Sequence, residues 1–304
     1  MSEWTIGIIG GSGLYGMEGL EETQWIEVGT PWGAPSDALL TGRLHGVKFV
    51  FLPRHGRGHR ISPSLLNARA NIDALKRAGC TDLVAISAIG SLREALAPGG
   101  FVIVDQFVDR TVARESSFFG PGLVAHVSMA EPVCPRLSAL LADAAEAAGA
   151  DVARGGTYLA MEGPHFSTRA ESHLYRAWGC DVIGMTAMPE AKLAREAELP
   201  YALCGMVTDY DCWREGEEAV EVSAIIARLE ANAGTARRMV EHLARALPKQ
   251  RAASPIDTAL DHALITAPDA RDPAMLAKLD AVCGRVFNPK VNPPDPAAAG
   301  NSAP

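Results

Sequence analysis

Short apolar runs alternate with amphipathic segments over most of this chain, and this alternation limits the possible folds more than any other feature. The apolar runs are at residues 6–9, 83–86, 101–104, 181–185 and 201–207. The segments with helical signals are at residues 62–78, 135–148, 168–178, 189–197 and 223–247. Strands that alternate with helices form a mixed or mostly parallel sheet covered on both faces. We therefore expect an α/β fold.

Local signals mark several of these elements. Ser62 and Pro63 predict the start of a helix that ends at Gly79. Thr168 and Glu171 have the spacing of a capping box at the start of another helix. Between residues 23 and 52, glycine and proline separate two or three further strand-like runs.

The domain organisation follows from where this pattern stops. No linker and no internal repeat precede about residue 250, so we expect one domain over residues 1–250. Residues 251–287 form a C-terminal extension, in which Asp272 and Pro273 predict a short helix ending at Gly284. Residues 288–304 are rich in Pro, Ala and Asn and have little to bury, so we expect a disordered tail there.

The composition is that of a soluble globular protein: 48% of the 304 residues are hydrophobic and 21% are charged. The net charge of −8 argues against nucleic acid as a partner. No apolar stretch approaches the ~20 residues of a membrane span, and the N-terminus lacks the basic region of a signal peptide. The six cysteines form no C-x-x-C pair, so we expect reduced thiols and a cytoplasmic protein.

The glycine pattern after the first apolar run resembles that of a dinucleotide-binding site, but the residues that follow it do not fit such a site. Gly11, Gly13 and Gly16 match the dinucleotide fingerprint G-x-G-x-x-G. That fingerprint requires a following helix, whereas residues 21–33 have no helical periodicity. An NAD-dependent oxidoreductase is therefore a remote alternative. A plain turn is the commoner interpretation, and a turn whose amides and Ser12 hydroxyl hold an oxyanion is a third.

A basic loop follows the apolar strand that ends at Leu52. Residues 54–60, Arg-His-Gly-Arg-Gly-His-Arg, place five potentially cationic groups together. Guanidinium groups and backbone amides in such a loop can surround an anion, and a solvated basic loop is the alternative. A metal site through His55 and His59 is less favoured, because the glycines oppose the helix that would align the two rings.

Small and hydroxyl-bearing residues follow two other strands. Residues 87–91, Ser-Ala-Ile-Gly-Ser, come after the run at 83–86, and Thr186 stands between the run at 181–185 and a helix. A hydroxyl and an amide at a helix start can bind an anion. In open α/β folds, ligands bind beyond the carboxyl ends of the strands. We expect these segments and the basic loop to converge on one edge of the sheet.

Two carboxylates end the last strand-like run, in Thr208-Asp-Tyr-Asp-Cys-Trp213. Asp209 and Asp211 could contact the amino edge of adenine and protonate a ring nitrogen. A turn in which aspartate bonds to the local backbone is the more common interpretation of this segment taken alone.

Together, these segments closely resemble the trimeric branch of the purine nucleoside phosphorylase family, and within it the enzymes that act on S-methyl-5′-thioadenosine. The match runs in order over about residues 5–247. The runs that carry it are Ile6–Leu14, Pro35–Asp37, Arg54–Gly56, Ala88–Arg93, Asp105–Arg110, Met129–Pro132, Glu162–Pro164, Ala170–Ser172, Met185–Thr186 and Thr208–Trp213. The resemblance implies a single-domain phosphorylase fold, with a twisted mixed β-sheet flanked by helices, and a homotrimer with sites near the subunit interfaces.

The resemblance also implies roles for individual residues. The residues expected to hold phosphate are Ser12, Arg54, His55, Ser87, Thr186 and the backbone of Ala88. The residues expected at the nucleoside are Phe166 near the purine, Met185 under the ribose, and Asp209 and Asp211 at the adenine amino edge. Ser167 and Val222 match positions that shape substrate specificity, and His126 matches a position near the 5′-substituent.

The implied reaction is phosphorolysis of S-methyl-5′-thioadenosine to adenine and 5-methylthioribose 1-phosphate, a step of purine and methionine salvage. Asp209 could protonate N7 of the leaving base if burial keeps its proton on near neutral pH. No metal or organic cofactor is implied, because phosphate is a co-substrate. A phosphorylase for 6-oxopurine or methylthioinosine substrates is the close alternative, disfavoured by Asp209 where such enzymes usually carry Asn. A non-catalytic nucleoside-binding protein would keep the pocket and form no product.

Overall fold

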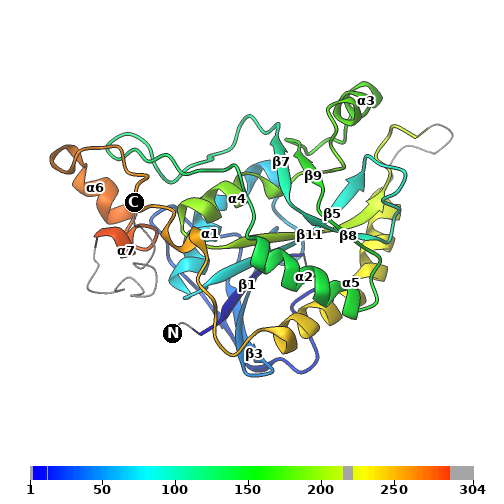
Figure 1. Ribbon diagram of the computed structural model, residues 1–304, viewed down its shortest axis with the longest axis horizontal. Coiled ribbons are helices and arrows are strands. Elements are labelled where there is room, and N and C mark those ends of the chain that lie inside the picture. Colours follow the sequence, from blue (N-terminus) through cyan, green and yellow to red (C-terminus); the bar gives the residue numbers. More distant parts are fainter. Residues whose placement is uncertain (1–2, 12, 215–221, 288–304) are drawn as a thin grey trace, which may run out of the picture.

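The computed structural model describes residues 3–11, 13–214 and 222–287, and of residues 222–225 the backbone alone. Strands and helices alternate along the chain as the apolar pattern predicts, and they form one α/β domain around a single mixed sheet (Figure 1). The strands are β1 (Thr5–Gly10), β2 (Glu21–Ile26), β3 (Leu39–Leu44), β4 (Val47–Pro53), β5 (Asp82–Ser91), β6 (Phe101–Val104), β7 (Gln106–Asp109), β8 (Val152–Arg154), β9 (Thr157–Ala160), β10 (Val182–Gly184) and β11 (Tyr201–Asp209).

Helices of two kinds accompany the sheet. The α-helices are α1 (Ala68–Arg77), α2 (Pro135–Ala147), α3 (Arg169–Ala177), α4 (Ala187–Glu196), α5 (Val222–Ala246), α6 (Pro273–Lys278) and α7 (Gly284–Phe287). Short 3-10 turns are at Pro63–Leu65, Pro255–Thr258 and Pro268–Ala270. None of the helices among the described residues has an apolar stretch long enough to cross a membrane.

Strand β5 is the centre of the sheet. It pairs in parallel with β1 on one side and with β11 on the other. Its last residues, Gly90 and Ser91, also pair antiparallel with β10. Because β5 and β11 run parallel and Gly90 pairs with Asp209, the carboxyl ends of these two strands lie side by side. This is where the hydroxyl-bearing and acidic segments of the sequence come together.

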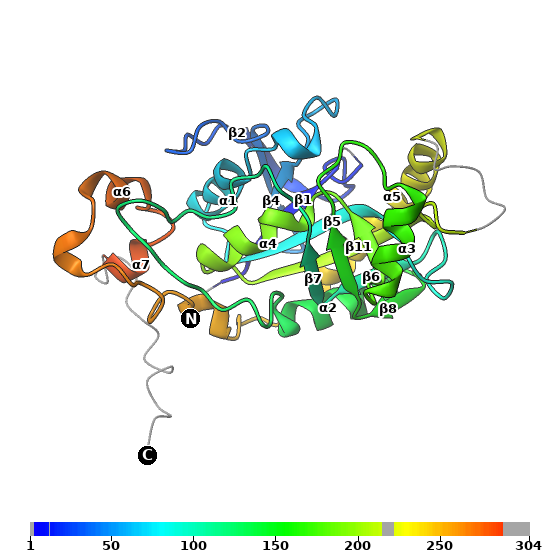
Figure 2. The ribbon, with the colours of Figure 1, turned by 90° about the horizontal axis from the view of Figure 1, so that it is seen from above.

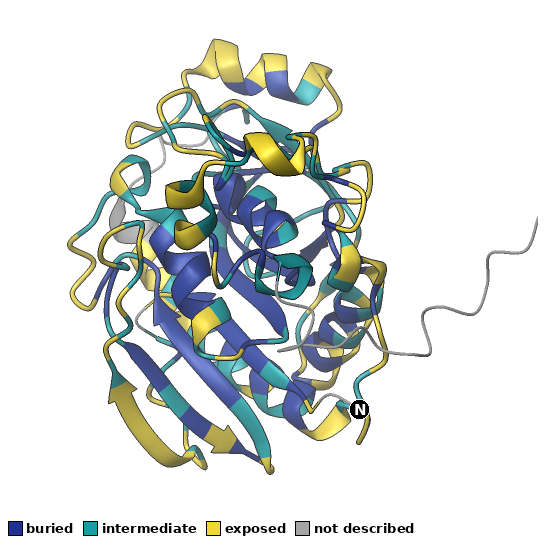
Figure 3. Cartoon of the chain, turned by 90° about the vertical axis from the view of Figure 1, so that its left-hand side faces the viewer, coloured by how far each residue is buried: buried dark blue, intermediate teal, exposed yellow. Residues whose placement is uncertain are grey.

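Each face of the sheet carries its own apolar core. Helices α1 and α4 cover one face, where Ile72 and Leu193 pack in the first core cluster. Helices α2 and α5 cover the other face, where Leu141 and Leu243 pack in the second. The inner strands are buried on both faces, whereas β2 at the edge is exposed (Figure 3).

Two helix ends differ from the sequence-based prediction. The capping box of Thr168 and Glu171 is confirmed at the start of α3. Ser62, in contrast, precedes only a 3-10 turn, and α1 begins at Ala68. Its N-cap is Asn67, whose side chain accepts from the Ala70 amide. The helix predicted from Pro273 to Gly284 is shorter than expected, because α6 ends at Lys278, and a separate helix, α7, begins at Gly284.

The C-terminal segment packs against the long loop between β7 and α2. Ala125 forms a bridge with Leu264, and the His126 amide donates to the Ala263 carbonyl at 2.9 Å. Leu279 and Cys283 are fully buried in the core cluster that α1 and α4 share. In Figures 1 and 2 this loop reaches the α6 end of the molecule. The predicted tail at 288–304 lies outside the described residues.

Candidate active site

The described residues that are expected to hold phosphate come from three separate segments of the chain. Arg54 and His55 follow β4, Ser87 and Ala88 belong to β5, and Thr186 precedes α4. Strand β5 continues to Ser91, so Ser87 and Ala88 lie inside a strand rather than after one as the sequence predicts. Ser12, the remaining residue of this group, lies outside the described residues.

Arg54 is a buried cation, with only 2% of its surface exposed. Its guanidinium donates to both carboxylate oxygens of Glu190, at 3.0 and 3.2 Å. It also donates to the carbonyls of Ile86 and Ile9, at 3.0 and 3.2 Å. Burial works against its charge, but Glu190 outweighs burial and raises the pKa of Arg54. Four of the five N–H donors of a guanidinium are thus filled, which leaves one on Nη1 for an anion.

His55 is held in a defined tautomer. Its Nδ1 lies 2.9 Å from the Ile61 carbonyl, which can only accept, so Nδ1 carries the proton and Nε2 has a free lone pair. Burial, assisted by the charge of Arg54, lowers the pKa of His55 to about 4. The ring also stacks on His59 with 4.2 Å between centroids. His55 is therefore neutral at pH 7 and can accept a hydrogen bond from a protonated phosphate oxygen.

Two hydroxyls meet beside these groups. Oγ of Ser87 and Oγ1 of Thr186 are 3.0 Å apart, and both residues are buried. Thr186 is the N-cap of α4, and its side chain makes no capping bond to the helix. Hydroxyls at a helix N-terminus are suited to phosphate oxygens, because the helix dipole favours negative charge there.

Two other arginines of the basic loop pair with neighbouring groups of the protein. Arg57 donates to both carboxylate oxygens of Asp37. Arg60 donates to the Ser36 carbonyl at 2.9 Å and lies 3.8 Å from the Asp37 carboxylate. Asp37 is buried, and its pKa falls to about 2 because the bonds from Arg57 outweigh the effect of burial. The expectation that Arg54 and His55 hold an anion stays a prediction. Among the described residues, no cluster of His, Cys, Asp or Glu could hold a metal ion.

The two carboxylates of the last strand lie at the end of β11. Thr208 Oγ1 donates to Asp209 at 2.6 Å, and the Asp211 amide donates to Asp209 at 2.8 Å. Oδ2 of Asp211 is buried without a hydrogen-bond partner. Burial raises the pKa of Asp211, and the charge of Asp209 adds to the rise. A buried acceptor without a donor is costly, and it marks where a ligand N–H would fit.

A glycine keeps the space beside these carboxylates open. Gly90 of β5 pairs with Asp209 across the strands. A Cβ atom at Gly90 would lie 3.0 Å from Oδ1 of Asp209 and 3.6 Å from Cβ of Asp211. Since Gly90 is three residues after Ser87 on the same strand, β5 joins the hydroxyl cluster to the acidic end of β11.

The structure gives a different contact or exposure for each of three further residues expected at the nucleoside: Ser167, Phe166 and Met185. The Cys212 thiol donates to the Ser167 carbonyl at 3.2 Å, which places Ser167 beside the acidic turn. Phe166 is 43% exposed, so its ring is available for contact with an apolar ligand. Met185, next to Thr186, packs closely on Gly163, where a Cβ would lie 2.6 Å from its sulfur.

His126 lies at a different place from these residues, and the side chain of Val222 is not described. His126 lines a separate cavity of about 420 Å³ together with Lys192 and Glu196. Glu196 is ten residues beyond Thr186 on α4, about 15 Å along a helix. Val222 is the first residue of α5, and its side chain lies outside the described residues.

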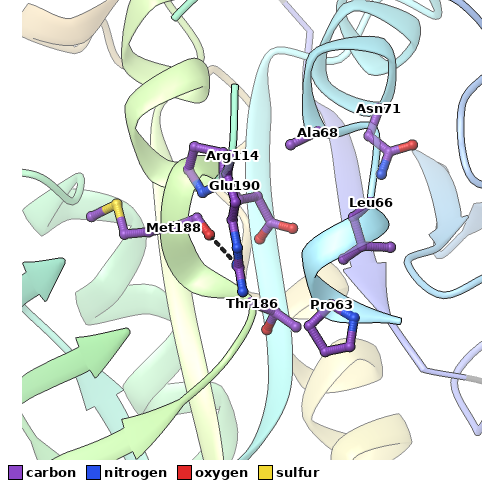
Figure 4. Close-up of a pocket in the computed structure, with 9 residues that line it drawn as sticks. Pro63, Leu66, Ala68, Asn71, Arg114, Thr186, Met188 and Glu190 are labelled. Carbon is purple, nitrogen blue, oxygen red and sulfur yellow. Dashed lines mark hydrogen bonds between the residues drawn. The ribbon is translucent and has the colours of Figure 1, made fainter. Parts of the chain in front are cut away.

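A smaller hollow beside Thr186 is lined by two residues that the motifs left out (Figure 4). These are Glu190, the partner of Arg54, and Arg114 from the loop after β7.

The sequence model of the phosphorylase superfamily matches residues 5–245. The chain belongs to this superfamily.

Relatives within the superfamily agree in their names. The chain is 63% identical to S-methyl-5′-thioadenosine phosphorylase of Cereibacter sphaeroides, over 93% of this chain and 98% of the relative. It is 56% identical to the protein of that name from Rhodospirillum rubrum, over 93% and 97% of the two chains. The resemblance stated from the motifs is thereby confirmed.

Solved structures of the superfamily have the same fold. A methylthioadenosine phosphorylase from an antarctic soil metagenomic library superposes with a TM-score of 0.88 at 45% identity, over 93% of this chain and 99% of that one. The Schistosoma mansoni enzyme in complex with adenine gives 0.74 at 39% identity, over 80% and 91%. The oxidoreductase alternative loses its structural basis, because the described residues 13–20 contain no helix and lead directly into β2.

Sequence reasoning could have found Glu190 but not Arg114. Glu190 stands in the apolar face of the α4 segment, and a buried acid needs a cationic partner. Arg114 lies in a loop without periodicity, so no spacing in the sequence shows what it contacts.

Proposed function

We propose that this protein cleaves S-methyl-5′-thioadenosine with inorganic phosphate and releases adenine and 5-methylthioribose 1-phosphate. The observation that carries the proposal is the pair of sites along β5: a cation and hydroxyl cluster at Ser87, and a buried acidic turn beside Gly90. A nucleoside phosphorylase needs this combination, because an anion must attack the sugar while the base leaves. The names of the relatives add the substrate class.

The phosphate end works mainly by electrostatics. In our proposal Arg54 offers its remaining N–H, Ser87 and Thr186 offer hydroxyls, and the Ala88 amide and Ser12 complete the shell. His55 accepts from the protonated phosphate oxygen through Nε2. Breaking the C–N bond creates an oxocarbenium-like sugar, whose positive charge the bound phosphate stabilises before it attacks C1′.

The base end works by proton donation. Adenine leaves poorly as an anion, so a donor at N7 is needed. Asp209 takes this role, because the Thr208 hydroxyl and the Asp211 amide hold its carboxyl at the end of β11. The unpartnered Oδ2 of Asp211 accepts from the 6-amino group. An acceptor at this place favours 6-aminopurines over 6-oxopurines, which have no hydrogen to donate there.

We further propose that the nucleoside site is completed between subunits of a homotrimer. Phe166 contacts the purine, Met185 the ribose, and Ser167 and Val222 shape the pocket. His126 lies near the far end of α4 from Thr186. We therefore propose that it serves the 5′-substituent in the site of a neighbouring copy.

The proposed reaction needs no metal and no organic cofactor, because phosphate is both nucleophile and electrostatic catalyst. The six cysteines are free thiols, which suits a reducing compartment such as the cytoplasm.

The proposal is tested by incubating the protein with S-methyl-5′-thioadenosine, adenosine or inosine, with and without phosphate, and measuring the free base. We expect adenine release from methylthioadenosine only when phosphate is present. Base release without phosphate would indicate a hydrolase. Preference for inosine would support the 6-oxopurine alternative, and binding without product would support a nucleoside-binding protein.

A further inference from the structure

Arg114 is a buried arginine that none of the proposed roles uses. Its side chain is 6% exposed, although it belongs to the irregular loop between β7 and α2. Figure 4 shows it beside Met188 and Glu190, close to Thr186. A buried cation in a loop requires hydrogen-bond acceptors. The acceptors of Arg114 show which segments this arginine holds together.

Every N–H of the Arg114 guanidinium has an acceptor. Nε donates to the Glu162 carboxylate at 3.1 Å. Nη1 donates to the carbonyls of Met185 and Met188, each at 2.6 Å. Nη2 donates to the carbonyls of Met161 and Glu162. The five donors of the fork are therefore all used within the protein, and none remains for substrate.

These acceptors belong to two segments that line the proposed site. Met161 and Glu162 follow β9, while Met185 and Met188 flank Thr186 at the start of α4. Met188 has extended backbone angles, φ −115° and ψ 134°, inside this helix. An extended residue interrupts the ladder of helical hydrogen bonds, so neighbouring carbonyls need another donor. Arg114 is this donor for the carbonyls of Met185 and Met188, which lie on either side of Thr186 in the chain.

Glu162 fixes Arg114 in turn. Its carboxylate accepts from the amides of Val112 and Ala113, at 2.6 and 3.3 Å, two residues or fewer before Arg114. These amides and Arg114 overcome the effect of burial and lower the pKa of Glu162 to about 2. Glu162 is therefore ionised near neutral pH, where it pairs with Arg114.

From this geometry we propose that Arg114 is the positioning residue of the phosphate site. It clamps residues 185–188 to the end of β9, which sets the place of the Thr186 hydroxyl and of the helix turn that carries Glu190, the partner of Arg54. This inference rests on the proposed phosphorolysis. Arg114 acts only through these neighbours and does not touch the reacting atoms.

Arg114→Lys tests the proposal, because lysine keeps the charge but has three donors on one atom and cannot replace the fork. Arg251→Lys is the matched control. Arg251 is also 6% exposed, and it binds Asp82, Asp257 and the Thr81 carbonyl. It lies in the C-terminal segment rather than in the site. Both variants should lower the melting temperature by similar amounts.

The kinetics should separate the two variants. Losing charge-assisted bonds at the clamp should raise the KM for phosphate and lower kcat/KM about 10- to 100-fold in Arg114→Lys. Arg251→Lys should stay within about twofold of the natural protein, the usual scatter for a site that is not coupled to the chemistry. An unchanged KM for phosphate in folded Arg114→Lys, or an equal kinetic loss in Arg251→Lys, overturns the proposal.

Two further measurements cover the remaining outcomes. If Arg114→Lys does not fold, Glu162→Gln decides, because it removes the ion pair and leaves the arginine. The KM for phosphate should rise several-fold, and an unchanged value refutes the clamp. If the natural protein shows no phosphorolysis, the proposed function has failed. Calorimetric titration of the same variants with inorganic phosphate then tests the positioning by itself, with weaker binding expected only at Arg114 and Glu162.

Discussion

At the scale of single residues, the site differs from the core in how its hydrogen bonds are filled. Arg114 is fully paired, Arg54 retains one open donor, and Asp211 has one oxygen without a partner. An alanine at position 54 would strand the buried charge of Glu190 as well as remove a phosphate contact. A substitution at Asp211, whose Oδ2 has no partner in the protein, therefore reports on function more cleanly than a substitution at Arg54.

Asp209→Asn should cost far more activity on methylthioadenosine than on a 6-oxo analogue. An asparagine amide can donate a hydrogen bond to N7 or to a 6-oxo group, but it cannot transfer a proton. A mismatched buried group costs about 1–3 kcal/mol, so the ratio of kcat/KM values should shift about 5- to 150-fold toward the 6-oxo substrate. Steady-state kinetics on both substrates measure this ratio.

Asp211→Asn is the comparison for that variant. This side chain accepts from the amino group in our proposal and gives no proton, so its loss should be the smaller of the two. Equal losses on both substrates in Asp209→Asn would mean that the aspartate only shapes the turn at the end of β11.

At the scale of elements, α4 connects the proposed phosphate site to the loop that carries His126. Thr186 is the N-cap residue of this helix, and Glu196 in its last turn accepts from the Ser117 hydroxyl and the Phe118 amide, each at 2.7 Å. Burial raises the pKa of Glu196 to about 7, although these two donors oppose the rise. The contact between helix and loop is therefore sensitive to pH near neutrality.

Glu196→Gln should flatten the dependence of stability on pH. The folded pKa lies above the usual value near 4.5, so the folded state holds the proton more tightly than the unfolded state. Stability from this group is complete at low pH and is lost as the pH rises through about 7, by at most about 3 kcal/mol. Denaturant titrations at pH 5 and pH 8 should differ less in Glu196→Gln than in the natural protein. The exposed Glu230→Gln serves as the control, and an equal flattening there would refute the assignment.

At the scale of the whole molecule, the C-terminal segment is joined to the domain by buried charges. Arg285 in α7 pairs with Glu198 after α4 and with Asp261. The Glu198 side chain is 2% exposed, and it also accepts from the Leu260 amide at 2.9 Å. Charge pairing and the burial of Leu279 and Cys283 attach residues 255–287 to the face of the sheet under α1 and α4.

Arg285→Ala should destabilise the protein by roughly 3 kcal/mol, because it leaves Glu198 as a buried charge without its partner. Arg245→Ala is the control, since that arginine is 59% exposed in its pair with Glu241 and should change stability by less than about 1 kcal/mol. Chemical denaturation of the three proteins measures both differences. A change below about 1 kcal/mol for Arg285→Ala would show that the segment is held by apolar packing alone.

The sequence by itself was sufficient for the α/β class, most strands and helices, and the segments that meet at the site. These depend on local properties: the spacing of apolar residues, glycine and proline at the ends of elements, and motifs confined to short runs. The capping box at Thr168 and the strand that begins at Tyr201 are examples. Where Ser62 misled, the competing signal was also local, a second cap at Asn67.

Only the tertiary structure decided which polar groups satisfy one another. Arg57 and Arg60 turn to Asp37, 20 or more residues away, and Arg114 reaches acceptors 47 to 74 residues away. Such partners are chosen by burial, because a buried charge takes whichever acceptor the packing brings to it, and no local pattern records that choice. For the same reason the sequence locates the basic loop but does not show that Arg57 and Arg60 pair with Asp37 and that Arg54 pairs with Glu190.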